Sequence, residues 1–265
     1  PPFVRLEADR FTHFTAYSDT RMSVLYRNVD TLTVDLYRLP ESELFTLTGV
    51  NQWEIWQDYH VPNPDETLIW SRSYEVVEER NVSIRQVVTL TDELGNELTP
   101  GIYFVEVAQP FVAPDESDPN AASQVVDAAT DSMYTSQALV VISNLNLTFK
   151  KSDSATSMVW LTDLRTGEPV GDVPIRFFNQ GSEVADGDTA DDGTLMAELR
   201  PDPNMTWAPL LAMAGEPGDE NFALVSSEWS SGIAIWDFNL AGGWSLDALQ
   251  SYFYTDRPIY RPGQT

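Results

Sequence analysis

The sequence predicts an all-β protein made of two antiparallel β-sandwiches in tandem. Short β-rich segments bounded by proline and glycine recur along most of its 265 residues. Leu32, Val34 and Leu36 alternate with polar residues, which is the pattern of a strand with one buried and one solvated face. A chain of this length holds about two domains of ordinary size. An aromatic content of 11% favours packed sheets.

Residues 1–110 are predicted to form the first sandwich. Two β-rich segments, 22–29 and 31–36, are separated by turn residues at 28–30, so we expect them to form a hairpin. The other strands expected in this domain are 82–90 and 98–107, the second of which follows a Pro-Gly turn.

The part from about 41 to 80 is less regular, and we predict an aromatic-rich insertion packed over one edge or end of the first sandwich. Leu44, Leu47 and Val50 recur at steps of three, typical of a short amphipathic helix, until the Pro-Asn-Pro at 62–64. Two roles stay open for its tryptophans: they anchor the insertion to the core, or they form an exposed surface that stacks on sugars. The candidates for such a carbohydrate-binding surface are Trp53, Trp56 and Trp70.

Residues 135–228 are predicted to form the second sandwich, after an acidic connector at 111–134 without lasting periodicity. Residues 138–142 are a continuous apolar run, which favours a strand covered on both faces. The further strands expected are 145–150, 157–163, 174–178, 207–213 and 222–227. A second connector, 229–250, leads to a last extended segment at 251–265.

No catalytic or metal site is predicted. His13 and His60 stand beside no nucleophile motif and form no metal-ligand pair. An EF-hand loop that begins at Asp188 would place Ala190 at the third position and Leu199 at the twelfth, where oxygen ligands are required, so we expect a β-turn. The carboxylates of 111–134 also lack regular ligand spacing. We therefore expect no cofactor and no enzymatic activity.

Charge and cysteine content exclude several other classes. The chain has 15 basic and 41 acidic residues and a net charge of -26, which repels nucleic-acid backbones and anionic membranes. No apolar run approaches the ~20 residues of a membrane helix, so no membrane insertion by this segment is expected. The chain has no cysteine, which excludes disulfide bonds, cysteine nucleophiles and cysteine-ligated metals.

Two sets of motifs resemble macroglobulin (MG) domains of bacterial α2-macroglobulin-like proteins. The run at 254–265, with its Asp-Arg-Pro-Ile-Tyr-Arg-Pro-Gly core, resembles the opening strand of such a domain. Within the second predicted sandwich, four segments follow the order and approximate spacing of another MG domain. They are 140–147, 159–164, 166–170 and 191–195. One departure is the longer acidic turn, in which Ala190 separates Thr189 from Asp191.

This resemblance implies fibronectin type III-like sandwiches, with 251–265 as the opening strand of a truncated third MG domain. It also implies a scaffold segment of a protease inhibitor that traps endopeptidases after they cleave a bait. The thioester of such proteins requires a cysteine, so this chain cannot contain it. The implied partners are neighbouring MG domains and, through the intact parent, target proteases; the implied location is periplasmic or extracellular. Expected inter-domain contacts are Trp236, Trp244, Tyr254 and Tyr260. The alternative is an extracellular carbohydrate-binding or adhesion module.

Overall fold

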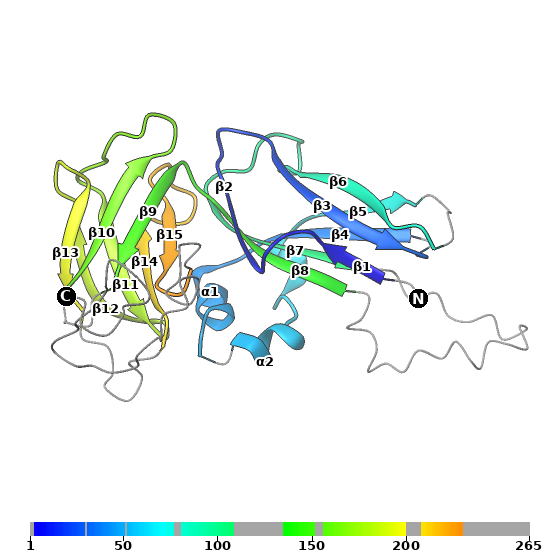
Figure 1. Ribbon diagram of the computed structural model, residues 1–265, viewed down its shortest axis with the longest axis horizontal. Coiled ribbons are helices and arrows are strands. Elements are labelled where there is room, and N and C mark those ends of the chain that lie inside the picture. Colours follow the sequence, from blue (N-terminus) through cyan, green and yellow to red (C-terminus); the bar gives the residue numbers. More distant parts are fainter. Residues whose placement is uncertain are drawn as a thin grey trace, which may run out of the picture. The chain divides into compact units, whose positions relative to one another are not determined.

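The computed structural model of the chain describes residues 3–29, 31–50, 52–76, 81–108, 135–151, 156–199 and 208–229 (Figure 1). Residues 1–229 form one compact unit. The described elements in it are mainly strands, which form four sheets, so the all-β prediction is confirmed.

The first sandwich packs a three-stranded sheet against a five-stranded sheet. The smaller sheet has the order β1-β3-β6 and the larger sheet the order β2-β8-β7-β4-β5. Paired strands are antiparallel, except that β2 and β8 run parallel. The bounds are β1 Phe3–Leu6, β2 Phe11–Phe14, β3 Thr20–Arg27, β4 Thr31–Arg38, β5 Leu68–Glu75, β6 Ile84–Leu90, β7 Gly101–Ala108 and β8 Thr135–Ile142.

The core of the first sandwich lies between these two sheets. Val24 of β3 is 0% exposed and Val34 of β4 is 1% exposed, and both belong to the same apolar cluster. Along β3, and along β4 as far as Leu36, every second side chain is buried, because successive side chains of a strand point to opposite faces. The alternation predicted from the sequence therefore identifies the strand faces that form this core.

The predicted hairpin at 22–36 is wrong, because β3 and β4 lie in opposite sheets. β3 pairs with β1 and β6, whereas β4 pairs with β5 and β7. Asn28, with φ at 54°, lies in the connection, and its Oδ1 accepts a hydrogen bond from the Asn81 N–H at 2.6 Å. A short polar turn has the same composition whether it joins two strands of one sheet or crosses the core. The sequence alone does not distinguish these arrangements.

Two predicted boundaries also need correction. β8 pairs along its whole length with β7, so 135–142 completes the first sandwich and the second begins after Ile142. The insertion predicted at 41–80 ends earlier, because β5 pairs with β4 at the edge of the five-stranded sheet. Both strands were misplaced because partners distant in sequence, not local composition, decide which sheet a strand joins.

Short helices between β4 and β5 confirm the helical part of the insertion. They are α1 Glu41–Leu47, α2 Gln52–Gln57 and α3 Pro64–Thr67. Leu44 and Leu47 of α1 are fully buried in an apolar cluster with Ile102 and Phe104 of β7. These two β7 residues lie on the face of the sheet that points away from the first core. The insertion therefore covers the outer face of the five-stranded sheet.

The second sandwich consists of the sheets β13-β10-β9 and β12-β11-β14-β15, all with antiparallel pairs. Its core includes Val159, Leu161, Ile175 and Phe177, all 0% exposed. The bounds are β9 Leu145–Lys150, β10 Thr156–Asp163, β11 Pro174–Asn179, β12 Ser182–Asp188, β13 Thr194–Glu198, β14 Leu210–Ala214 and β15 Ala223–Ser226. The edge strand β12 was not predicted, because it consists mostly of small and acidic residues.

The acidic segment before β13 forms the predicted turn. The Gly193 N–H donates to the Ala190 carbonyl, and the Ala190 N–H donates to the Thr194 carbonyl, each at 2.8 Å. Gly193 has φ at 75°, and a Cβ there would overlap the Leu161 carbonyl oxygen. This position therefore requires glycine for two reasons, backbone conformation and close approach.

Candidate functional site at the junction of the two sandwiches

One apolar cluster joins the two sandwiches, and we call it the junction cluster. It takes side chains from the outer face of the five-stranded sheet, from the helical insertion and from the second sandwich. Its buried members are Tyr37, Leu39, Leu44, Leu47, Trp56, Tyr59, Val61, Ile102, Phe104, Leu139, Val141, Phe178, Leu211, Met213, Phe222 and Leu224. Burying apolar side chains from both sandwiches together stabilises one arrangement of the pair.

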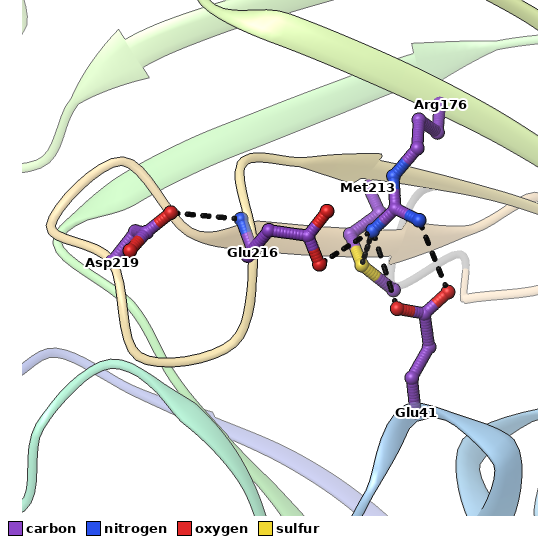
Figure 2. A network of polar contacts seen from close by, with 5 residues as sticks. All are labelled: Glu41, Arg176, Met213, Glu216 and Asp219. Carbon is purple, nitrogen blue, oxygen red and sulfur yellow. Dashed lines mark hydrogen bonds and ion pairs between the residues drawn. The ribbon is translucent and has the colours of Figure 1, made fainter.

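A polar network around Arg176 lies beside this cluster (Figure 2). Arg176 of β11 donates from Nη1 and Nη2 to the two carboxylate oxygens of Glu41 at 3.4 and 3.2 Å. Its Nη2 also donates to Oε2 of Glu216 at 3.0 Å and contacts Sδ of Met213 at 3.5 Å. Glu41 begins α1, so the guanidinium joins the helical insertion to the second sandwich by a two-pronged ion pair.

The Arg176 network is only half-buried. The side chains of Arg176 and Glu41 are 25% and 24% exposed, and that of Glu216 is 62% exposed. Water and salt therefore weaken these ion pairs. The Arg176 guanidinium also lies 5.2 Å from the ring centre of Phe178, which helps to hold it in place. The network orients the junction more than it stabilises it.

A second polar contact links the loop after β2 to the turn after β10. The Tyr17 hydroxyl donates to Oδ2 of Asp163 at 2.9 Å, and the Arg165 guanidinium lies 3.9 Å from the Tyr17 ring centre. The Asp163 carboxylate also accepts the backbone N–H groups of Thr166 and Arg165, each at 2.8 Å. The Thr166 N–H, followed by the Tyr17 hydroxyl, lowers the pKa of Asp163. The bond to Asp163 raises the pKa of Tyr17.

Ser143 stands at the point where the chain passes from β8 into β9. It is 5% exposed, and its Oγ lies 2.6 Å from the carbonyl oxygen of Phe222 and 2.7 Å from that of Leu145. The same Oγ accepts the Leu145 N–H at 2.9 Å, and the Ser143 N–H donates to the Phe14 carbonyl at 3.0 Å. One residue thus joins the backbones of β2, β9 and the start of β15.

Two backbone contacts complete the junction. The Gly218 N–H donates to the Pro100 carbonyl at 3.0 Å, and the Val50 N–H donates to Oε1 of Gln180 at 3.4 Å. The polar contacts thus lie at several separate places around one apolar cluster. Such an arrangement resists rotation of one sandwich against the other. The polar groups therefore hold the two sandwiches in position.

The described residues contain no group of three or more His, Asp or Glu side chains placed to hold a metal ion. Across the same residues, no helix has the length and apolar character to span a membrane.

The tryptophans proposed as a sugar-binding surface are not displayed together. Trp56 is 3% exposed in the junction cluster, where its Nε1 donates to the Leu47 carbonyl at 3.0 Å. Trp70 is 9% exposed in the core of the first sandwich. The interpretation as one exposed surface is therefore wrong for these two residues, which anchor the insertion and β5 instead. Trp53 lies in α2, and its side chain falls outside the described part.

Other predicted contacts lie outside the described residues. They are Trp236, Trp244, Tyr254 and Tyr260, together with the connector 111–134 and the segment 251–265. Sequence reasoning in turn missed Arg176, Glu41 and Ser143. The one available signal was Arg176, a basic residue within the apolar run 174–178 of a strongly acidic chain.

Comparison with known families identifies the second sandwich. Residues 142–245 match the family model described as bacterial alpha-2-macroglobulin MG3 domain. The chain contains an α2-macroglobulin-like macroglobulin domain. The match begins at the end of β8, where the sheet pairing also places the start of the second sandwich. The predicted resemblance is confirmed.

A relative and two solved structures extend the likeness to most of the chain. Alpha-2-macroglobulin of Pasteurella multocida (strain Pm70) is 20% identical over 271 residues, which cover 95% of this chain and 14% of that protein. Native Escherichia coli alpha-2-macroglobulin spanning domains NIE-MG1 has a TM-score of 0.59 at 15% identity, covering 85% of this chain and 97% of that chain. The form spanning MG0-NIE-MG1 gives 0.57 at 16% identity, covering 86% and 64%. These macroglobulins share the fold, and this chain spans only a small part of the Pasteurella protein.

Proposed function

We propose that this chain is a structural scaffold segment of an α2-macroglobulin-like protease inhibitor. The observation that carries the proposal is the match of 142–245 to the MG3 domain model. In this role the two sandwiches hold a fixed arrangement within the parent, and the segment itself contains neither bait nor thioester. The lack of cysteine supports the absence of a thioester, because a thioester requires a cysteine sulfur.

The junction supports a scaffold role over an enzymatic one. Its buried side chains are apolar, and the polar groups around it are used in contacts between the two sandwiches. We infer that the segment has no catalytic activity of its own. Its partners are neighbouring macroglobulin domains of the parent and, through that parent, target proteases. The family resemblance supports a periplasmic or extracellular location.

The test compares the isolated chain with its parent protein. Each is mixed with a protease, and cleavage of a large protein substrate is followed beside cleavage of a small peptide. We expect the parent to protect the large substrate while the peptide is still cleaved, because a trapped protease is shielded only from bulky molecules. The isolated chain should protect neither.

A pair of variants in the parent links this activity to the junction. Phe104→Ala removes a ring from the junction cluster, whereas Met196→Ala changes a side chain that is 60% exposed. The first should reduce protection of the large substrate and the second should leave it unchanged. A parent that never protects the large substrate, or an isolated chain that inhibits alone, would contradict the scaffold role.

A further inference from the structure

A row of polar side chains crosses the outer face of the five-stranded sheet. Strand register places Ser71 of β5 opposite Asp35 of β4, Asp35 opposite Glu106 of β7, and Glu106 opposite Gln137 of β8. Side chains directly opposite in antiparallel strands share a face, with Cβ atoms about 4.5–5.5 Å apart. The sheet therefore sets two carboxyl groups side by side, and nothing in the scaffold role requires them.

This row lies at the margin of the helical insertion. Nε2 of Gln137 donates to the Trp56 carbonyl in α2 at 2.9 Å. The neighbouring positions on the same face, Tyr37 and Phe104, belong to the junction cluster. Asp35, Glu106 and Gln137 are each partly buried. The carboxyl pair thus stands where the apolar cover meets solvent.

Two buried acceptor atoms in this row lack a hydrogen-bond donor within the described part of the chain. They are Oδ1 of Asp35 and Oε1 of Gln137. Glu106 lies between these two residues in the register. An ionised Glu106 adds only further acceptors, whereas a protonated carboxyl supplies one O–H donor. Buried acceptors without donors are costly, so the arrangement favours the protonated form.

We propose that Glu106 keeps its proton beside Asp35, which makes the outer face of this sheet a proton-binding site coupled to the stability of the junction. In this site Glu106 carries the proton and donates to Oδ1 of Asp35. Loss of the proton leaves two carboxylates facing each other across β4 and β7.

The charges around the pair agree with this assignment. Burial, followed by the charge of Asp35, raises the pKa of Glu106, while His60 from the loop after α2 lowers it. Burial, with Asp35 and Glu106, raises the pKa of Tyr37 to about 12, so that phenol stays neutral. The Arg10 guanidinium, which precedes β2, lies 5.8 Å from the Trp56 ring centre. Ser71 and Gln137 complete the row without charge.

The direction of the pH effect follows from the raised pKa. The folded chain keeps the Glu106 proton above the ordinary glutamate pKa of 4.5, where the unfolded chain has lost it. The stability that this proton contributes is fully present below pH 4.5. It is lost as the pH rises through the pKa that Glu106 has in the folded chain. The unfolding equilibrium constant should change about tenfold for each unit by which the pKa is raised.

The experiment compares the 265-residue chain with its Glu106→Gln and Asp35→Asn variants. Urea unfolding is measured at a series of pH values from 4.5 upward. Glutamine keeps the shape and a donor but cannot ionise, so Glu106→Gln should gain stability relative to wild type as the pH rises. Glu183→Gln, at an exposed position on β12, is the control and should show no such change. Parallel curves for wild type and Glu106→Gln would overturn the proposal.

Infrared spectroscopy of the wild-type chain provides a second test that needs no stable variant. One C=O stretching band of a protonated carboxylic acid should persist above the pH at which exposed carboxyls ionise. It should be absent in Glu106→Gln and should move to lower pH in Asp35→Asn, where repulsion is gone. Absence of the band in wild type contradicts a proton held by Glu106. Stabilisation by calcium chloride that disappears in Glu106→Gln would assign a cation instead and would also overturn it.

Discussion

The five-stranded sheet of the first sandwich and the β13-β10-β9 sheet of the second differ in how they are covered. Along β7, both faces are buried, with Phe104 at 0% exposure outside and Val105 at 1% inside. On the β13-β10-β9 sheet the apolar core residues lie on the inner face, and Trp160 and Met196 on the other face are 42% and 60% exposed. One sheet is a central layer and the other is an outer layer.

This difference shows where the two sandwiches depend on each other. A sheet with two apolar faces needs a second layer, which the helical insertion and the β11-β14-β15 side of the second sandwich supply together. The outward face of the β13-β10-β9 sheet needs no covering layer, because threonine and lysine lie among its apolar side chains. Substitutions on the two sheets should therefore have unequal effects.

The largest contrast is expected between Phe104→Ala and Met196→Ala. Phe104 packs against Tyr59 and Trp56, with ring centres 5.1 and 5.9 Å away, so its loss leaves a cavity in the junction cluster. We expect Phe104→Ala to lower the free energy of unfolding by about 3–5 kcal/mol. Met196→Ala should change it by no more than about 0.5 kcal/mol. Urea denaturation measures both, and equal losses would remove the distinction between the two sheets.

A smaller effect is expected from Ser143→Ala. The alanine leaves the Leu145 N–H and the Phe222 carbonyl without their Oγ partner in a buried place. We expect a loss of about 1–3 kcal/mol in the free energy of unfolding. The control is Ser73→Ala, which changes an exposed serine on β5 and should be nearly neutral. A neutral Ser143→Ala would show that the crossing point between the sandwiches is held by apolar packing alone.

The smallest effect is expected from Arg176→Ala. The Arg176–Glu41 pair is about a quarter exposed and the Glu216 partner is 62% exposed, so screening reduces the contribution of these ion pairs to about 1 kcal/mol or less. The loss should shrink further at high salt. The matched control is Arg21→Ala, since the pair between Arg21 and Asp19 is exposed at 62% and 55% and lies away from the junction. Equal losses for the two variants, or no response to salt, would count against a role for Arg176 in the junction.

Much of the fold could be predicted because strand patterns are local. The continuous apolar run of β8 correctly indicated two-sided burial, and the alternation along β4 correctly indicated its inner face. The other face of β4 is not fully solvated, because Asp35 is partly buried and Tyr37 belongs to the junction cluster. The wrong predictions concern which sheet a strand joins. The turn at Asn28 and the start of the second sandwich depend on which distant strand supplies the hydrogen bonds.

The candidate site was less predictable for a similar reason. Glu41, Ser143 and Arg176 are ordinary residues in their local sequence, and they gain a role only when the fold brings them to one junction. The tryptophans, by contrast, are large aromatic residues that can stack on sugars, so the sequence suggested them as a candidate site. Burial of Trp56 in the insertion and of Trp70 in β5 shows that both side chains are anchors. Contacts between residues far apart in the sequence leave no local signal.

Differential scanning calorimetry of the 265-residue chain tests the central claim most directly, that the second sandwich is part of the structure that covers the first. If it is, residues 1–229 unfold in one cooperative transition whose calorimetric and van't Hoff enthalpies agree. Phe104→Ala then lowers the temperature of that whole transition. Two separate transitions, with only the first sandwich shifted by Phe104→Ala, would show independent domains and would contradict the account.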